Sequence, residues 1–372
     1  MDSVLKFPFY AKASLVCIGL FAFTTILFFT QEIIVPIIYS TIIAIALTPM
    51  VDLMVRKGFN RILAITITVV LLILFTIALI TVLSSQMIQF ADSFPILIEK
   101  FRELLKRSVS WTSDNFNIST YKINSWLNEK NAELIRKGSS AIAQTIISTG
   151  NALVILVLIP VYIFMILYYQ PMLIQFIFKL FKIGNQKEVH EVLSATKIII
   201  KNYLGGLLVE GAIVAILQTM ALLIIGIDYA LLLGVLCAII NVIPYLGGFV
   251  AVTLPMLIAF VSNSISSSLF VGMAFVFIQL IDNNYLIPKV VASKVKINAL
   301  VSVVVVLAGG ALWGIAGMFL SIPLTAIIKV IFDHIESLKP WGFLLGNPTS
   351  EPQKEKRIKL KNTFKISPRS VP

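Results

Sequence analysis

The chain has 372 residues, of which 58% are hydrophobic and only 13% are charged, and its formal net charge is +12 at pH 7. A water-soluble fold of this length has no interior large enough for so much apolar surface, so a soluble globular protein is excluded. The Lys and Arg residues lie in loops and in the C-terminal tail, between apolar runs of about twenty residues. This distribution predicts an all-α polytopic membrane protein and gives no reason to expect a nucleic-acid partner.

Four apolar runs in the first half of the chain are long enough to cross a bilayer. The expected spans cover about 13–30, 33–50, 62–83 and 151–169. No small-residue cleavage site follows the first run, so we expect an uncleaved pair of helices rather than a signal peptide. Arg56, Lys57 and Arg61 lie in the short loop after the second run. By the positive-inside rule, this loop and the N-terminus are predicted to be cytoplasmic.

Residues 84–150 form a polar region on the predicted outer side. Leu97, Phe101, Leu104 and Leu105 recur at helical spacing, which indicates amphipathic helices. Such helices lie on the membrane or against a neighbouring subunit. A plain surface cap fits the same pattern. The region is long enough for its basic residues not to dictate its side of the membrane.

The second half of the chain contains one unit written twice. Each copy has seven residues from a glycine to a glutamine, and ten from an aromatic residue to a proline. The pairs are Gly211 and Gln218 with Tyr245 and Pro255 in the first copy, and Gly272 and Gln279 with Trp313 and Pro323 in the second. Corresponding Gly- and Pro-interrupted apolar segments are a sequence sign of a transporter's binding site.

Counting membrane passes predicts how each copy folds. Residues 206–226 and 267–287 each make one crossing, and the apolar runs 230–262 and 299–333 follow them. A helix of 33 residues is about 50 Å long, too short for two crossings of a core about 30 Å thick. Each run is either one tilted span or a re-entrant hairpin. The basic residues after residue 287 and in the tail require hairpins, which enter from opposite faces.

The predicted fold is therefore about six full transmembrane helices plus two oppositely oriented re-entrant helical hairpins in an inverted repeat. The glycines of these runs would supply the turns, or would only let helices pack closely. The residues expected at the hairpin turns are Pro244, Tyr245, Gly247, Gly248, Gly309, Gly310, Gly314, Gly317 and Pro323. The expected division of the chain is 1–83 for three N-terminal spans, 84–150 for the outer amphipathic helical region, 151–205 for the fourth span and a cytoplasmic helical linker, 206–335 for the inverted-repeat transport core with two hairpins and 336–372 for a basic cytoplasmic tail.

Only two of the eighteen acidic residues, Glu210 and Asp282, fall well inside the predicted spans. A carboxylate at the bilayer centre costs at least about 2.5 kcal/mol, so both should face a cavity, bind a proton or pair. Four amides on the same segments complete the expected substrate or ion pathway, namely Gln218, Asn241, Gln279 and Asn283. We expect Asp282 with Asn283 to hold the coupling ion and Glu210 to be a second carrier. A buried structural acid is the alternative reading of Asp282.

Enzyme chemistry has no recognisable basis in the sequence. There is no GxxxxGK[ST] phosphate loop and no GxSxG elbow. His190 and His334 lack the spacing of metal ligands. We therefore expect neither an enzyme, nor a cofactor, nor a metal site.

Three motifs together resemble the autoinducer-2 exporter family of bacterial membrane proteins, and the resemblance covers nearly the whole length. They are Asn241-Val-Ile-Pro-Tyr-Leu-Gly247, Asp282-Asn-Asn-Tyr-Leu-Ile-Pro-Lys289 and Gly309-Gly-Ala-Leu-Trp-Gly-Ile-Ala-Gly-Met-Phe-Leu-Ser-Ile-Pro323. The resemblance implies a multi-pass inner-membrane transporter active in quorum sensing, which forms homo-oligomers such as pentamers. The sequence departs from the family pattern at Gly205-Gly-Leu207, Gly248 and Asn298-Ala299. These differences put the identity of the substrate in doubt more than the fold.

Three functions remain open at this stage. The leading one is a secondary active exporter of a small polar, autoinducer-2-like solute, driven by a proton or sodium gradient. The second is a sodium/proton antiporter without an organic substrate, and the third is a non-coupled channel or membrane scaffold. Acidic residues inside the membrane and paired broken hairpins favour a carrier.

Overall fold

The computed structural model describes residues 8–116, 149–243, 246–262, 264–291 and 297–346, and within these ranges all regular structure is helical. Its elements in chain order are α1 (Phe9–Phe29), α2 (Gln31–Arg56), α3 (Arg61–Phe116), α5 (Thr149–Leu180), η1 (Ile183–Asn185), α6 (Gln186–Ile225), α7 (Ala230–Asn241), α8 (Leu246–Ser262), α9 (Ile265–Ile281), the π-helix η2 (Asp282–Val291), α10 (Ala299–His334), η4 (Glu336–Leu338) and α11 (Lys339–Leu345).

Seven helical segments in the described ranges are long and apolar enough to cross a membrane. They are Phe9–Phe29, Gln31–Arg56, Arg61–Phe90, Val157–Leu180, Gln186–Ile225, Ile265–Ile287 and Ala299–His334. Large apolar side chains cover their outer faces, and Phe21, Phe75 and Ile224 are 74%, 68% and 82% exposed. Such a surface is stable only against lipid. The predicted all-α polytopic membrane class is therefore confirmed.

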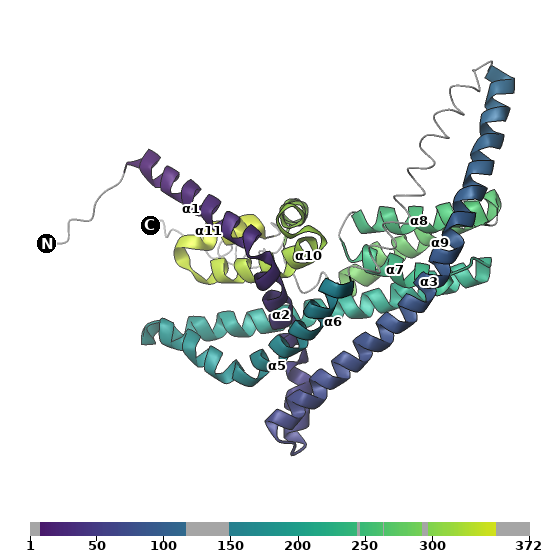
Figure 1. Cartoon of the computed structure of the whole chain (residues 1–372). Coiled ribbons are helices and arrows are strands. Elements are labelled where there is room, and N and C mark those ends of the chain that lie inside the picture. Colours follow the sequence, from purple (N-terminus) through teal and green to yellow (C-terminus); the bar gives the residue numbers. More distant parts are fainter. Residues whose placement is uncertain (1–7, 117–148, 244–245, 263, 292–296, 347–372) are drawn as a thin grey trace, which may run out of the picture.

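Two helices are longer than the sequence predicts. The third expected span ends near residue 83, whereas α3 continues without a break to Phe116 and extends away from the other helices (Figure 1). The polar residues after 83 continue the helix because helix propensity does not require apolar surroundings. The rest of the predicted outer region, and the side chains of its apolar stripe, lie outside the described residues. Similarly, α6 begins at Gln186 and joins the helical linker expected before residue 206 to the span expected after it.

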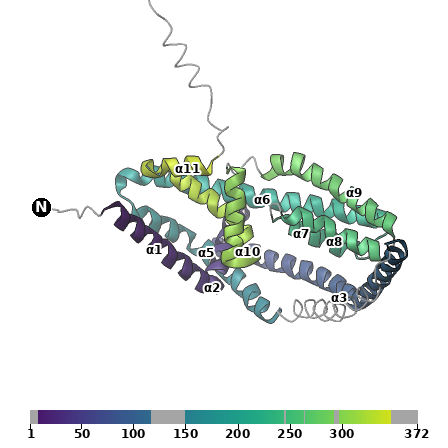
Figure 2. The same ribbon diagram turned by 90° about the horizontal axis from the view of Figure 1, so that it is seen from above.

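α6 connects the two ends of the molecule. Both views show α1 and α11 at one end and α7, α8 and α9 at the other, with α6 reaching from one to the other (Figures 1 and 2). One end of the molecule is held by an apolar core in which Tyr203 and Ile200 of α6 meet Ile42 of α2 and Leu320 of α10. Leu222 of α6 belongs to a second core with α7, α8 and α9. Buried apolar side chains therefore hold α6 in two separate cores of the molecule.

α7 and α8 fold back on each other and form the first hairpin. Val242 and Ile243 close the end of α7, and Gly247 then lies directly against the backbone of Ile240 and Asn241. At the other end of α7, Gly234 packs against Thr219 of α6 with no room for a Cβ atom. Two of the predicted turn residues, Pro244 and Tyr245, lie outside the described residues.

α10 forms the second hairpin, because its chain reverses at Trp313 and Gly314. Gly314 has φ 61° and ψ −144°, a conformation open almost only to glycine. Gly309 and Gly317, on either side of the reversal, then touch backbone to backbone. Pro323 lies beyond the turn, buried within the second half of α10. Two reversals thus occur in the expected runs, while their re-entry into the membrane and their opposite orientation stay predictions.

Candidate functional site

Two acidic side chains and one amide meet inside the helical assembly. Asn241 Nδ2 donates a hydrogen bond of 2.8 Å to Asp282 Oδ2. Glu210 lies close enough to Asp282 for the two carboxyl groups to interact electrostatically. Glu210 and Asp282 are 3% and 1% exposed, so water has little access to either side chain. We call Glu210, Asn241 and Asp282 the acid site.

Each member of the acid site comes from a different element, and two come from helix ends. Asn241 is the last residue of α7, and Asp282 is the residue at which α9 changes into the π-helix η2. Glu210 lies in the middle of α6. Changes from α- to π-helix are frequent at functional sites, because they redirect side chains and free backbone groups. The site therefore depends on how three elements pack.

An apolar collar surrounds the acid site. Val214, Ala238, Ile278 and Leu286 form one buried cluster. Each lies about one helical turn along the chain from a member of the site, so it points to the same side of its helix. The collar keeps water away and lowers the local dielectric, which strengthens every electrostatic interaction inside it.

No basic side chain balances the acid site. Among the described residues, neither Glu210 nor Asp282 has a Lys, Arg or His nitrogen within 4 Å. Two ionised carboxylates buried side by side repel each other strongly, and desolvation adds to the cost. The arrangement is stable when the two groups share a proton or hold a cation. The acid site thus combines two buried carboxylates with no basic partner among the described residues.

Two buried oxygen atoms near the site accept no hydrogen bond in the described part of the chain. They are Asp282 Oδ1 and Gln218 Oε1. Gln218 lies two turns beyond Glu210 on the same face of α6 and is 1% exposed. Buried polar atoms without partners are rare and often mark a ligand position. The role of Gln218 in a substrate or ion pathway stays a prediction.

The other two predicted pathway residues lie apart from the acids. Asn283 is exposed, and its Oδ1 accepts a hydrogen bond of 3.4 Å from Gln279 Nε2. The Gln279 side chain packs against Gly248 near the turn of the first hairpin. The geometry therefore groups Asp282 with Asn241 and Glu210, and Gln279 with Asn283 and the hairpin. A role for Asn283 in ion binding stays a prediction.

Tyr203 is a further candidate, which the sequence analysis does not name. It lies seven residues before Glu210 on the same face of α6, is 4% exposed and packs with Leu320 of α10. The phenol is close enough to Glu210 and Tyr39 to interact electrostatically with both. Its seven-residue spacing from Glu210 was the available signal. Tyr203 connects the acid site to the second hairpin.

Comparisons with known proteins give consistent results. The sequence model of one protein family, described as AI-2E family transporter, matches residues 17–337 of this chain. YhhT of Escherichia coli (strain K12) is 24% identical over 317 residues, which cover 85% of this chain and 88% of YhhT. YrrI of Bacillus subtilis (strain 168) is 26% identical over 311 residues, which cover 82% and 87%. The AI-2 transport protein TqsA of Escherichia coli (strain K12) is 23% identical over 337 residues, which cover 87% and 92%.

Proposed function

The chain belongs to the AI-2E transporter family, as its motifs predict, and on this basis we propose that it is a secondary active transporter of the bacterial inner membrane. It exports a small polar solute of the autoinducer-2 kind, in exchange for protons or sodium ions that enter the cell. The relation to TqsA supports the solute class, and the acid site supports the coupling.

The observation that carries the proposal is the unbalanced pair of buried carboxylates. A proton or sodium ion bound between Glu210 and Asp282 would lower the charge of the pair from −2 to −1, remove most of the repulsion and let the helices around it close. Its release would restore the repulsion and favour a state in which one carboxylate reaches water. Asn241, at the end of α7, would transmit this change to the first hairpin. This links ion occupancy to the conformation that solute transport needs.

A sodium/proton antiporter without an organic substrate is the second candidate. It is favoured by the composition of the acid site, since two carboxylates and one amide offer only oxygen ligands and one donor. Oxygen ligands suit hard cations. In this case Gln218 Oε1 would serve the ion path rather than a solute.

The test is transport in liposomes that contain the purified full-length protein and a pH-sensitive dye. Asp282→Asn and Glu210→Gln keep side-chain size but remove the charge, so we expect proton flux to fall to the level of protein-free liposomes. Asp228→Asn, in the exposed loop between α6 and α7, is the matched control and should transport normally. Unchanged flux in Asp282→Asn would refute the coupling role of the acid site.

Adding sodium and then autoinducer-2 separates the candidates. A proton flux that requires the solute supports the exporter, and one that answers to sodium alone supports the antiporter. Solute leakage without any ion dependence indicates a channel, and the absence of all fluxes in correctly folded protein indicates a scaffold.

The proposal includes cytoplasmic termini and two hairpins that open on opposite faces. Cysteines introduced one at a time in a Cys17→Ser/Cys237→Ala background test this with a membrane-impermeant thiol reagent. Asp228→Cys and Ser266→Cys flank the first hairpin and should react in intact cells. Leu300→Cys and Glu336→Cys flank the second and should react only after the membrane is opened. Reaction of all four from one side would exclude the inverted arrangement.

The number of subunits stays a prediction, to be measured by native mass spectrometry.

A further inference from the structure

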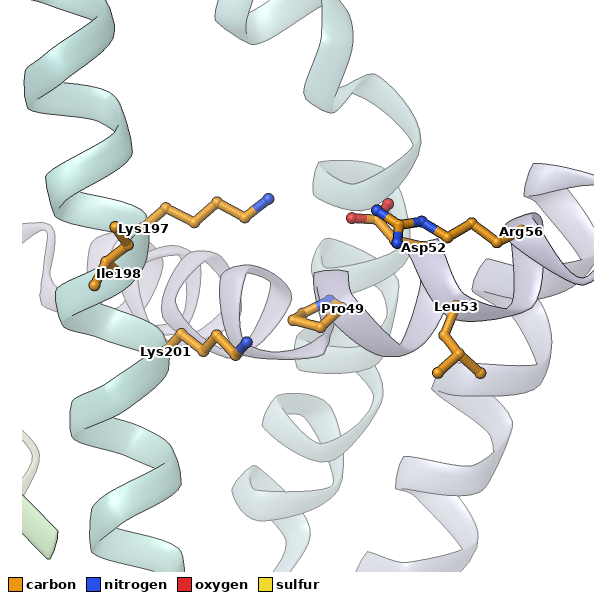
Figure 3. A pocket seen from close by; sticks show the side chains of 7 residues that line it. All are labelled: Pro49, Asp52, Leu53, Arg56, Lys197, Ile198 and Lys201. Carbon is orange, nitrogen blue, oxygen red and sulfur yellow. The ribbon is translucent and has the colours of Figure 1, made fainter.

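A second site lies between α2 and α6, well apart from the acid site along the chain. It is a pocket of about 380 Å³ whose charged lining consists of Arg56, Lys197, Lys201 and Asp52. Figure 3 shows Lys197 and Lys201 reaching from α6 toward α2, while the guanidinium group of Arg56 points toward Asp52. We call it the basic pocket.

Helical spacing explains why these side chains gather. Asp52 and Arg56 are four residues apart on α2, and Lys197 and Lys201 are four residues apart on α6, so each pair occupies one face of its helix. The two faces meet because Ile42 of α2 packs in one core with α6. The packing thus brings together two segments that the charge rule assigns to the same, cytoplasmic side.

The charges in the basic pocket do not cancel. Three cations face one carboxylate, an excess of two positive charges. In the described part of the chain none of the four groups forms an ion pair within 4 Å. Mutual repulsion of the cations is relieved by an anion between them. Arginine and lysine are the side chains that bind phosphate groups best.

Apolar side chains complete the lining. Leu53 and Ile198 stand beside the charged groups and are 53% and 58% exposed. Arg56 ends α2, and the lysines precede the long apolar part of α6, so the pocket lies at the level where helices leave the hydrocarbon core. A site with cations toward water and apolar residues toward lipid matches a molecule with the same two parts.

We propose that the basic pocket binds an anionic phospholipid. Arg56, Lys197 and Lys201 hold the headgroup phosphate, and Leu53 and Ile198 contact the upper acyl chains. Basic pockets between membrane helices on the cytoplasmic side bind such headgroups. The bound lipid ties α2 to α6, the helix that carries Glu210, and so stabilises the scaffold of the acid site. The carboxylate of Asp52 repels the headgroup phosphate and so lowers the affinity for the lipid.

Native mass spectrometry of the full-length protein, released from phosphatidylglycerol/phosphatidylcholine nanodiscs, tests the proposal. We expect retained phosphatidylglycerol in the unchanged protein and about fivefold less for each cation removed, hence about 25-fold less in Lys197→Gln/Lys201→Gln. Lys187→Gln, an exposed position on the same helix outside the pocket, should retain as much lipid as the unchanged protein. Equal retention in the double variant and in this control would overturn the proposal.

A second variant, Asp52→Asn, distinguishes a loss of lipid binding from misfolding of the protein. It removes the one negative charge, so retention should rise about fivefold, which damage to the fold cannot produce. Two arms identify the ligand source. Excess inorganic phosphate should leave the lipid bound, and displacement of the lipid by phosphate would assign the pocket to a soluble anion instead. Equal retention of phosphatidylcholine would show that charge does not matter and would also refute the proposal.

Discussion

The two hairpins occupy equivalent places in the sequence repeat but carry different groups at their turns. In the first, the end of α7 presents Asn241 to Asp282. In the second, the turn is bound to the N-terminal helices: Trp313 Nε1 donates to the Leu27 carbonyl oxygen of α1 at 3.0 Å, and the Tyr39 hydroxyl of α2 donates to the Ala316 carbonyl oxygen at 3.1 Å. One turn faces the acid site and the other is anchored to α1 and α2.

Two copies of a sequence repeat can therefore carry different polar groups and have different roles. Both hairpins use glycines to bring backbones into contact, so the mechanical part is shared. The polar groups at the turns differ. Asn241 donates to the buried carboxylate of Asp282, whereas Trp313 donates to a backbone carbonyl oxygen of α1. The first hairpin is the candidate moving part, and the second is the candidate fixed part.

Among the changes that test the difference between the hairpins, Asn241→Leu should reduce transport most. The substitution keeps the side-chain size but removes the donor to Asp282 Oδ2, and a buried carboxylate without its partner costs about 1–3 kcal/mol. We expect ion-coupled flux in liposomes to fall about tenfold or more. Asn284→Leu, an exposed asparagine that bonds only to its own helix, is the control and should transport normally. Equal flux in both variants would remove the functional difference between the hairpins.

Alanine at the two glycine contacts sharpens the comparison. In Gly247→Ala the new Cβ meets the Ile240 carbonyl oxygen, and in Gly317→Ala it meets that of Gly309. Backbone cannot yield as a side chain can, so each variant should lose up to about 3 kcal/mol of stability. Thermal unfolding in detergent measures this loss. Only Gly247→Ala should also reduce coupling, because it displaces Asn241. A coupling defect in Gly317→Ala of equal size would contradict the assignment of roles.

Gly314→Ala tests the turn of the second hairpin. Its φ of 61° with ψ −144° strains any side-chain-bearing residue, which should lower stability by about 2 kcal/mol, although open space surrounds the position. Gly205→Ala is the matched control, since Gly205 lies inside α6 with nothing near a new Cβ. There alanine should raise stability by about 1 kcal/mol. Equal melting temperatures for the two variants would refute the strain argument.

The smallest effect is expected for Trp313→Phe. The variant keeps an aromatic ring but loses the hydrogen bond to Leu27, which should lower stability by about 1 kcal/mol and leave ion coupling intact. Differential scanning fluorimetry and the liposome assay check the two parts. Tyr39→Phe, which also loses one bond and keeps the stacking on Phe319, should behave alike. Loss of coupling in both would make the second hairpin a moving part as well.

The fold class and the approximate spans were predictable because they follow from the lengths of apolar runs. The reversals near Gly247 and Gly314 were also expected, since run length and charge distribution leave few alternatives. Less predictable was the course of α3, which continues to Phe116 through polar residues, because the hydropathy of a segment says little about where a helix ends.

The acid site was predictable in part. Glu210 and Asp282 stand out in the sequence because ionisable groups in membrane spans are costly and therefore functional. Asn241, rather than the adjacent Asn283, is the amide that bonds Asp282, and 41 residues separate the two partners. Successive residues of a helix point in different directions, and here Asp282 is buried while Asn283 is exposed.

The sequence alone identified a membrane protein and its approximate spans, and it singled out Glu210 and Asp282 as acids inside those spans, because the cost of placing polar groups in lipid is a local property of each segment. Which side chains meet depends on the tertiary structure: Asn241 meets Asp282, Trp313 meets α1, and Arg56 of α2 lines one pocket with the two lysines of α6. These contacts join residues far apart in the chain, and they depend on packing angles and side-chain directions that no local pattern encodes.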